Sequence, residues 1–228
     1  DELIEISRFI HANPELGYQE KKSSECLLSR LKNHGFEIEY PVAGVKYAFR
    51  ASVKGRKGGP SIGFISEYDA LPEIGHGCGY NLIAASGFGA AAALAPFIRE
   101  LGGSIYLFGT PAEECAGGKI PMIERGLFKA VDVTMMMHPE GMYLVNTVGL
   151  ALDALEFRFY GKASHAACTP HEGVNALDAM ILLYNGVNAL RQQVKPDVRI
   201  HGVITKGGAA PNIIPDFTEA RFYIRSLD

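Results

Sequence analysis

The stretch SIGFISEYDALPEIGHGCGYN, residues 61–81, opens with an apolar run typical of a buried strand and continues as a long loop rich in glycine and acidic side chains. An Ala-rich apolar segment at 82–100 follows and predicts a helix. Two further apolar runs, 104–108 and 131–137, predict two more buried strands. Because short apolar strands alternate with helices, we expect an α/β fold with a mostly parallel sheet flanked by helices.

The segment before this stretch has the apolar spacing of two amphipathic helices, at 3–10 and 18–33, and a strand-like run at 47–53. After about residue 150 the pattern changes to a strand, a helix and two more strands, which predicts a small α+β domain with an antiparallel sheet. We therefore predict two domains, 1–149 and 150–228. The predicted elements of the second domain are 152–159, 174–193, 198–205 and 217–225.

The overall composition excludes several classes of protein. The net charge of −3 over 228 residues gives no basis for electrostatic binding to nucleic acid or to an anionic membrane. The longest apolar stretch, 82–98, contains Pro96, and we expect it to fall short of the roughly 20 residues of a membrane span. No secretory signal is recognisable, and the cysteines lack the spacing of a disulfide framework. We therefore expect a cytoplasmic protein with reduced thiols at Cys26, Cys78, Cys115 and Cys168.

Polar side chains follow each of the three predicted buried strands. Asp69 comes after the first strand, Glu113 and Glu114 after the second, and His138 directly after the third. Functional groups of α/β sheets gather at the carboxyl ends of strands, so we expect these side chains to lie close together. Carboxylate and imidazole groups are common metal ligands. The pattern therefore predicts a metal site at this edge of the sheet.

Each of these residues also has an ordinary structural explanation. Adjacent glutamates are most often a solvated acidic loop, but Glu113 and Glu114 follow a buried strand, where one can bind a metal and the other take a proton from water. His138 alone would more often be a satisfied polar group than a ligand. Its position beside the predicted strand end with Glu113 and Glu114 favours the ligand.

The remaining candidates leave alternatives open. Cys78, between two glycines, is either a zinc ligand or a small buried hydrophobe. His76 is either a ligand or a loop hydrogen-bonding group, and Asp69 either binds metal, orients a ligand or forms a turn. In the second domain, His165 in KASHAACTP and Asn212 in GGAAPNIIP are explained equally by turn chemistry or by ligand binding.

Several longer motifs occur together in a fixed order. They resemble the metallo-amidohydrolase and carboxypeptidase family, which has a zinc-exopeptidase-like fold, and in particular the branch of hippurate hydrolases, auxin-conjugate hydrolases and aminobenzoyl-glutamate hydrolase. Two of the motifs match the lid domain of this branch, through which its subunits pair. The motifs are HANPELGYQE (11–20), SEYDALP (66–72), GHGCGYNL (75–82), GTPAEECAGGK (109–119) and MMMHPE (135–140), and in the lid GKASHAACTP (161–170) and HGVITKGGAAPNIIP (201–215).

The resemblance implies a two-metal hydrolase, with zinc, manganese or cobalt, that cleaves the amide bond of N-acyl amino acids or dipeptide-like molecules with a free carboxylate. It also implies a homodimer formed through the lid. The implied metal ligands are Cys78, Glu114 and His138, and the implied general base is Glu113. His165 would stabilise the oxyanion. The implied carboxylate-binding residues are Asn212 and Arg225.

Two departures from the family pattern affect these expectations. The family has a second histidine ligand where this chain has Tyr80, and a phenol with a pKa near 10 is a poor ligand. Either His76 substitutes, or the site holds one ion, or the chain is an inactive homologue with a binding or regulatory role. Family members are also nearly twice as long, so we expect both domains to be incomplete. A nucleotide-binding protein is disfavoured, because no loop has a phosphate-binding fingerprint.

Overall fold

The computed structural model describes residues 1–145 and 149–227. Contacts divide the chain into two units, unit 1 at 1–143 and unit 2 at 144–228. The predicted domain boundary, between 149 and 150, falls within the first residues of unit 2. Each unit has its own sheet and its own apolar core.

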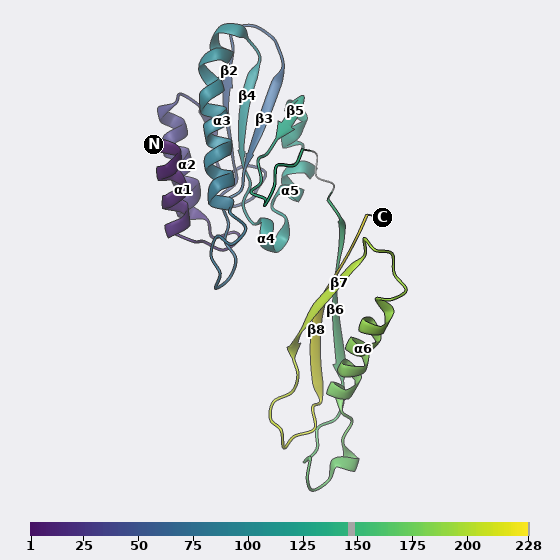
Figure 1. Cartoon of the computed structure of the whole chain (residues 1–228). Coiled ribbons are helices and arrows are strands. Elements are labelled where there is room, and N and C mark those ends of the chain that lie inside the picture. The colour runs from purple at the N-terminus through teal and green to yellow at the C-terminus, as the bar shows by residue number, and fades with distance from the viewer. Residues whose placement is uncertain (146–148, 228) are drawn as a thin grey trace. The chain divides into compact units, whose positions relative to one another are not determined.

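Unit 1 is built on a five-stranded sheet with the order β1-β2-β4-β3-β5 (Figure 1). Strand β3 runs parallel to both β4 and β5, whereas β2 is antiparallel to β4 and β1 is antiparallel to β2. The parallel part of this mixed sheet is the part that the sequence predicts. The strands are β1 (Glu37–Glu39), β2 (Phe49–Lys54), β3 (Ser61–Ser66), β4 (Ser104–Gly109) and β5 (Val133–Met135).

Helices cover both faces of this sheet. The long helices α1, α2 and α3 pack on one face and form the main core with residues such as Leu27, Phe88 and Leu107 (Figure 1). A second core on the other face contains Phe108 and Met122 and lies under the short helices α5 and η1. The helices of unit 1 are α1 (Glu2–Ala12), α2 (Lys21–Asn33), α3 (Tyr80–Leu101), α4 (Glu113–Ala116), α5 (Lys119–Glu124) and η1 (Leu127–Ala130).

Helix α3 corrects one expectation from the sequence. It continues through Pro96 for 22 residues and, by length and mean hydropathy alone, is long and apolar enough to cross a membrane. In this fold it is a core helix. Ala84, Phe88, Ala91 and Ala95 recur at the three- and four-residue spacing of one helix face and are buried in the main core, and this packing holds the helix together despite the proline.

Strand β5 corrects a second expectation from the sequence, the burial of the segment at 131–137. The sequence predicts a buried strand at 131–137, but the strand covers only Val133–Met135 and is exposed. Val133 is 51% and Met135 44% exposed. The physical reason is position, because β5 lies at the end of the sheet and has β3 as its one neighbour.

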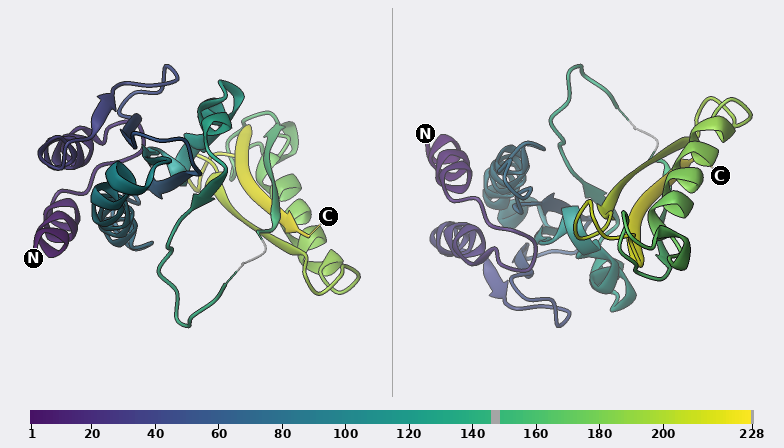
Figure 2. Two further views of the ribbon diagram at one scale, coloured as in Figure 1. Left: turned by 90° about the horizontal axis from the view of Figure 1, so that it is seen from above. Right: turned by 90° about the horizontal axis from the view of Figure 1, so that it is seen from below.

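Unit 2 is a three-stranded antiparallel sheet with the order β6-β8-β7 and one long helix. The predicted β-α-β-β order is confirmed. Helix α6 lies along one face of the sheet (Figure 2), where Met180 packs with Ala220 and Phe222. The side chain of Asn175 caps this helix by accepting a hydrogen bond from the Leu177 N–H. The elements are β6 (Ala151–Tyr160), η2 (Pro170–Glu172), α6 (Ala176–Leu190), β7 (Arg199–Lys206) and β8 (Phe217–Ser226).

Candidate active site

The carboxyl ends of β3 and β4 lie side by side and begin the two loops that form the candidate site. Ser66 is the register partner of Gly109 at the last position of both strands. The next residue after β4, Thr110, donates its backbone N–H to the Ser66 carbonyl oxygen at 2.9 Å. The loop after β3 and the loop after β4 therefore start next to each other.

The loop after β4 makes a tight turn before it reaches the two glutamates. Ala112 has a left-handed backbone with a φ of 62°, which is uncommon for a residue other than glycine. Gly118 lies against the start of this turn, where an added Cβ would lie 1.9 Å from the Pro111 carbonyl oxygen. The turn thus depends on the absence of a side chain at Gly118.

Two buried carboxylates hold this turn. Glu20 is fully buried and its Oε1 accepts the backbone N–H of Ala112 at 2.8 Å. Asp69 is 1% exposed and its Oδ2 accepts the backbone N–H of Glu114 at 3.0 Å. Burial raises the pKa of both carboxyls, and the backbone N–H groups oppose that shift. Asp69 therefore holds the backbone of the glutamate loop through Oδ2, while its Oδ1 is buried without a hydrogen-bond partner, so a role as metal ligand remains a prediction.

The two adjacent glutamates point to different surroundings. They begin the single helical turn α4, and successive side chains on a helix diverge by about 100°. Oε2 of Glu113 lies 2.5 Å from the Lys119 Nζ. Glu114 instead interacts with the thiol of Cys78 and the hydroxyl of Tyr80.

Glu67 and Lys119 belong to the same cluster, although the sequence patterns point to neither of them. The Lys119 ammonium forms an ion pair with Glu67 in addition to Glu113. Glu67 is 2% exposed, and burial raises its pKa while the Lys119 ammonium opposes the shift. The available sequence signals were a carboxylate directly after the predicted strand and a lysine inside the acidic loop motif.

Cys78 and Tyr80 lie on the Glu114 side of the cluster. Burial and the neighbouring Glu114 carboxylate raise the pKa of the Cys78 thiol to about 11. The same two causes raise the pKa of the Tyr80 phenol, whose residue is 6% exposed. Both groups therefore carry their protons at neutral pH, and a metal that binds Cys78 has to displace one.

His138 completes the group. Its ring meets the Tyr80 ring edge-on, with ring centres 6.2 Å apart. Its Nδ1 lies 2.8 Å from the Pro139 carbonyl oxygen, which only accepts hydrogen bonds, so Nδ1 carries the proton. Histidines that bind a metal through Nε2 commonly donate the Nδ1 proton to a carbonyl oxygen in this way.

The chemistry of these side chains and their unsatisfied atoms show how well they fit a metal. Within 1–145 and 149–227, no three His, Cys, Asp or Glu side chains are arranged closely enough to hold an ion as they stand. Oε1 of Glu114 is nevertheless buried without a hydrogen-bond partner, and a thiol and an imidazole lie on the same side. Thiol, carboxylate and imidazole are the donor types of a zinc site. The family pattern described above has a second histidine at the position of Tyr80, and a phenol is a poor ligand.

His76 lies elsewhere. Its ring centre is 6.2 Å from that of His11, and the groups that shift its pKa are burial, which lowers it, the Ile10 backbone, His11 and Glu15. All of these residues belong to α1 and the loop after it. The structure therefore places His76 beside α1 and the loop that follows it, and its substitution for the missing imidazole remains a prediction.

In unit 2, the loops that carry His165 and Asn212 pair with each other. The Ala166 N–H donates to the Asn212 carbonyl oxygen at 3.0 Å, and His165 forms a β-bridge with Ile213. Nδ1 of His165 accepts the backbone N–H groups of Ala167 and Cys168, each at 3.2 Å. His165 thus holds its own turn, and its Nε2 has the proton. The proposed roles of His165 and Asn212 remain predictions.

Arg225 lies far from Asn212 within unit 2. It is near the end of β8, eight residues after Phe217, whereas Asn212 precedes that strand. At about 3.3 Å per residue, Arg225 is about 26 Å from Phe217. The structure therefore does not bring Arg225 and Asn212 together within one copy of the unit.

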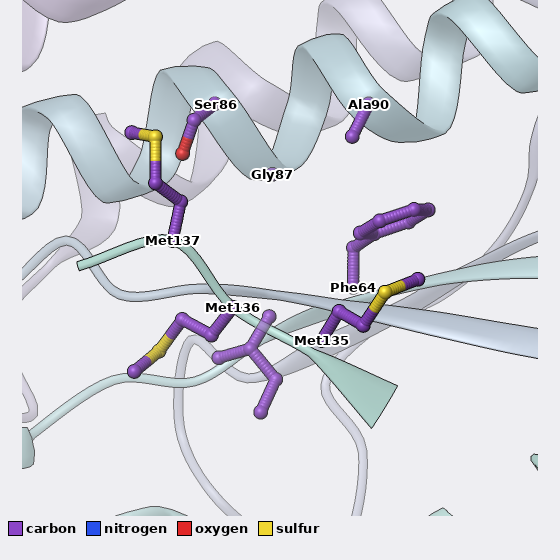
Figure 3. Close-up of a pocket in the computed structure, with 8 residues that line it drawn as sticks. Phe64, Ser86, Gly87, Ala90, Met135, Met136 and Met137 are labelled. Atoms are coloured by element: carbon purple, nitrogen blue, oxygen red, sulfur yellow. The ribbon is translucent and has the colours of Figure 1, made fainter. Parts of the chain in front are cut away.

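A small apolar pocket lies between α3 and the segment that leads to His138 (Figure 3). Met135 and Met137 point toward α3, while Met136 points to the opposite side. The lining contains no titratable side chain, so this pocket is separate in its chemistry from the carboxylate cluster. The lining residues are Phe64, Ile65, Ser86, Gly87, Ala90, Met135, Met136 and Met137.

Known proteins match both the sequence and the fold. The chain is 41% identical to the Xaa-Arg dipeptidase of Mus musculus, over 99% of this chain and 55% of that protein. It is 36% identical to one of the subunits of the p-aminobenzoyl-glutamate hydrolase of Escherichia coli K12, over 97% of this chain and 50% of that protein. The chain thus spans about half the length of the curated relatives it matches.

Solved structures agree in fold. An aminobenzoyl-glutamate utilization protein from Klebsiella pneumoniae superposes with a TM-score of 0.71 at 20% identity, over 99% of this chain and 66% of that one. The Bacillus subtilis YXEP protein, a dinuclear metal binding peptidase, gives 0.68 at 24% identity, over 99% and 64%. The model of peptidase family M20/M25/M40 matches residues 63–201, which include Cys78, Glu114 and His138. The chain belongs to peptidase family M20/M25/M40.

Proposed function

We propose that this chain is the metal-binding part of a hydrolase that cleaves the amide bond of small substrates with a free carboxylate, such as N-acyl amino acids and dipeptides. The observation that carries the proposal is the turn at α4, which separates two adjacent carboxylates. Glu114 lies with a thiol, and Glu113 lies outside that donor set. The relatives support the substrate class, because both are named for small amide-linked molecules that contain an amino acid.

Cys78, Glu114 and His138 would hold the metal, with zinc as the expected ion and manganese or cobalt as alternatives. When bound, the metal would polarise the substrate carbonyl and make water easier to deprotonate. The pKa of Cys78 near 11 means that metal affinity should increase with pH, because the thiol has to lose its proton.

Glu113 would act as general base and then as general acid. Its side chain is 38% exposed, so water and substrate can reach it. Its Oε2 is held by Lys119, which leaves Oε1 to take the proton from the attacking water. The same oxygen would then give that proton to the nitrogen of the leaving amine. We further propose that His165 stabilises the oxyanion and that Asn212 and Arg225, from different copies of the chain, contact the substrate carboxylate.

A direct assay tests this function. The purified chain would be loaded with zinc, manganese or cobalt and incubated with N-acetyl amino acids, p-aminobenzoyl-glutamate and dipeptides ending in arginine. Because Tyr80 replaces a ligand, we expect little activity, seen as slow metal-dependent release of free amine in mass spectrometry, that a chelator removes and that Glu113→Gln lowers about 100-fold. Absence of release with every metal and substrate would contradict the proposal for this chain.

A second candidate is a homologue that binds such molecules without cleaving them. Tyr80 favours it, because this buried phenol lies beside Glu114 in place of a ligand. Calorimetric titration separates the two functions. Saturable binding of an N-acyl amino acid with no product after long incubation would favour the binding protein.

A further inference from the structure

Glu113 and Glu114 are chemically identical and adjacent, so something outside them has to decide which one binds the metal. We propose that Lys119 makes this assignment. The Lys119 ammonium is held by the buried Glu67 and also pairs with Glu113. This pairing removes Glu113 from the set of metal ligands. This inference rests on the proposed function, because it concerns the division of roles at the same site.

The pairing is anchored by a buried carboxylate. Glu67 is 2% exposed, and its Oε2 is buried with no hydrogen-bond partner, so its charge depends on the ammonium that contacts Oε1. A buried carboxylate without a counter-charge is strongly destabilising, so Glu67 holds Lys119 firmly. The Lys119 side chain is itself only 19% exposed. Glu113 is then the outer partner of an ammonium that the interior of unit 1 fixes in place.

Lys119 follows the loop that carries the two glutamates, and its ammonium pairs with the first of them, Glu113. Lys119 begins α5 directly after Gly118, whose backbone lies against the Pro111 carbonyl. This close approach brings the start of α5 back against the turn that precedes Glu113. The ion pair between Lys119 and Glu113 spans this turn.

Glu114 has the complementary environment. Its backbone N–H is held by Asp69, and its Oε1 is buried without a hydrogen-bond partner among the described residues. Glu114 therefore remains available for a cation, whereas the corresponding position next to Glu113 is already filled by an ammonium.

The assignment predicts an exchange of roles when the ammonium is removed. In the native chain, zinc affinity should depend on Glu114 and not on Glu113. In Lys119→Met, which keeps the length and apolar stem of the side chain, Glu113 loses its partner and becomes free to bind the metal. Zinc binding should then tolerate the loss of Glu114.

The experiment is a matrix of zinc affinities, measured on the full chain by competition with a chromogenic chelator and checked by elemental analysis. We expect Glu114→Gln to weaken zinc binding by about 100-fold or more, whereas Glu113→Gln changes it by less than about 3-fold. In the Lys119→Met background, we expect Glu114→Gln to cost less than about 10-fold. Lys119→Arg should restore the strict dependence on Glu114, and Lys129→Met, at an exposed lysine, is the matched control.

The assignment would be overturned if Glu114→Gln lowered zinc affinity by the same factor in the native chain and in the Lys119→Met background. Lys119→Met leaves the buried Glu67 without its counter-charge. The zinc affinities are therefore measured again on Glu67→Gln/Lys119→Met, whose fold is checked by circular dichroism. Failure of the proposed function looks different, because Glu114→Gln in the otherwise native chain would then bind zinc as well as the native chain. That outcome would remove the metal site itself, and the role assignment with it.

Discussion

Glu20 and Ala112 are joined by a hydrogen bond of 2.8 Å although 92 positions separate them in the sequence. Glu20 directly precedes α2, and Ala112 directly precedes the two glutamates of α4. The bond therefore ties the N-terminal helices to the turn that carries Glu113 and Glu114. Residues far from the proposed chemistry thus help to set its geometry.

The buried Glu20 predicts a pH dependence of stability. Burial raises its pKa to about 7, above the ordinary 4.5 of the unfolded chain. The folded state thus binds the proton more tightly. The resulting stabilisation is fully present below pH 4.5 and is lost as the pH rises through about 7. The difference in pKa corresponds to about 3 kcal/mol.

Glu20→Gln keeps an acceptor for the Ala112 N–H but does not titrate. Between pH 4.5 and pH 8, the titration of Glu20 should lower the free energy of unfolding of the native chain by about 3 kcal/mol. This contribution should be absent in Glu20→Gln, as measured by urea denaturation at each pH. Glu25→Gln, at an exposed position of the same helix, is the control. Parallel pH profiles for Glu20→Gln and the native chain would show that Glu20 is ionised in the folded state with an ordinary pKa.

The second prediction concerns Glu113. In a form of the protein that turns over substrate, Glu113→Gln should lower kcat by about 100-fold or more, because proton transfer is lost while the side-chain shape is kept. Zinc content, measured by elemental analysis, should stay within error of the native value. Glu124→Gln, an exposed glutamate on the next helix, serves as control. Loss of metal in Glu113→Gln would mean that the two glutamates have the opposite roles.

The sequence predicts some elements with the observed bounds and others not, for identifiable reasons. Strand β3 lies at 61–66 as predicted, since an apolar run between a Gly-Pro turn and an acidic loop leaves few alternatives. The predicted burial of β5 is wrong, because an apolar run looks the same at the edge of a sheet as in its middle. Pro96 is tolerated in α3 because the packing of the helix outweighs its local preference.

Some residues of the candidate site could be predicted from the sequence and others could not. Cys78, Glu114 and His138 could be selected, because each lies in a motif or directly after a strand. Glu67 directly follows a strand and Lys119 lies in a motif too, but their importance arises from a pairing between distant positions that the sequence does not display. The pairing exists only once β3 and β4 have brought their loops together.

The third prediction concerns Tyr80. The native chain should bind fewer than two equivalents of zinc, since a phenol ligates only after it loses its proton and the surroundings of Tyr80 raise its pKa further. Tyr80→His should increase the zinc content measured by elemental analysis after loading and dialysis. Tyr80→Phe removes the hydroxyl without adding a ligand and controls for the change in size. Two tightly held ions in the native chain would show that the ligand set is misassigned.

The fourth prediction tests the turn itself. A Cβ at position 118 would lie 1.9 Å from the Pro111 carbonyl oxygen, far inside van der Waals contact, so Gly118→Ala should displace the glutamate loop. We expect a loss of about 1–3 kcal/mol in unfolding free energy, together with weaker zinc binding. Gly58→Ala, where an added Cβ meets nothing within 4 Å, should leave both quantities unchanged. Native stability and zinc affinity in Gly118→Ala would contradict this account.

The fifth prediction concerns assembly through unit 2. Leu182 on α6 is 71% exposed and Val203 on β7 is 62% exposed, which leaves apolar surface for a partner. We expect a homodimer, which light scattering would report as twice the chain mass of 24.7 kDa. Leu182→Glu should shift the sample toward the monomer, while Leu3→Glu, at an exposed leucine of unit 1, should not. A monodisperse monomer of the native chain would also exclude a role for His165 in a second subunit.

The exposed edge of unit 1 has a consequence for how the protein ages. Met135, Met136 and Met137 are 44%, 42% and 55% exposed, whereas Met122 and Met180 are fully buried. Oxidants convert exposed thioethers to sulfoxides, which are polar and chiral. Met142, which follows His138, is 67% exposed as well. Peroxide should therefore modify residues on both sides of His138 while it spares the buried Met122 and Met180. Stored samples will then become heterogeneous around a proposed metal ligand, and peptide mapping of residues 135–142 is the appropriate quality control.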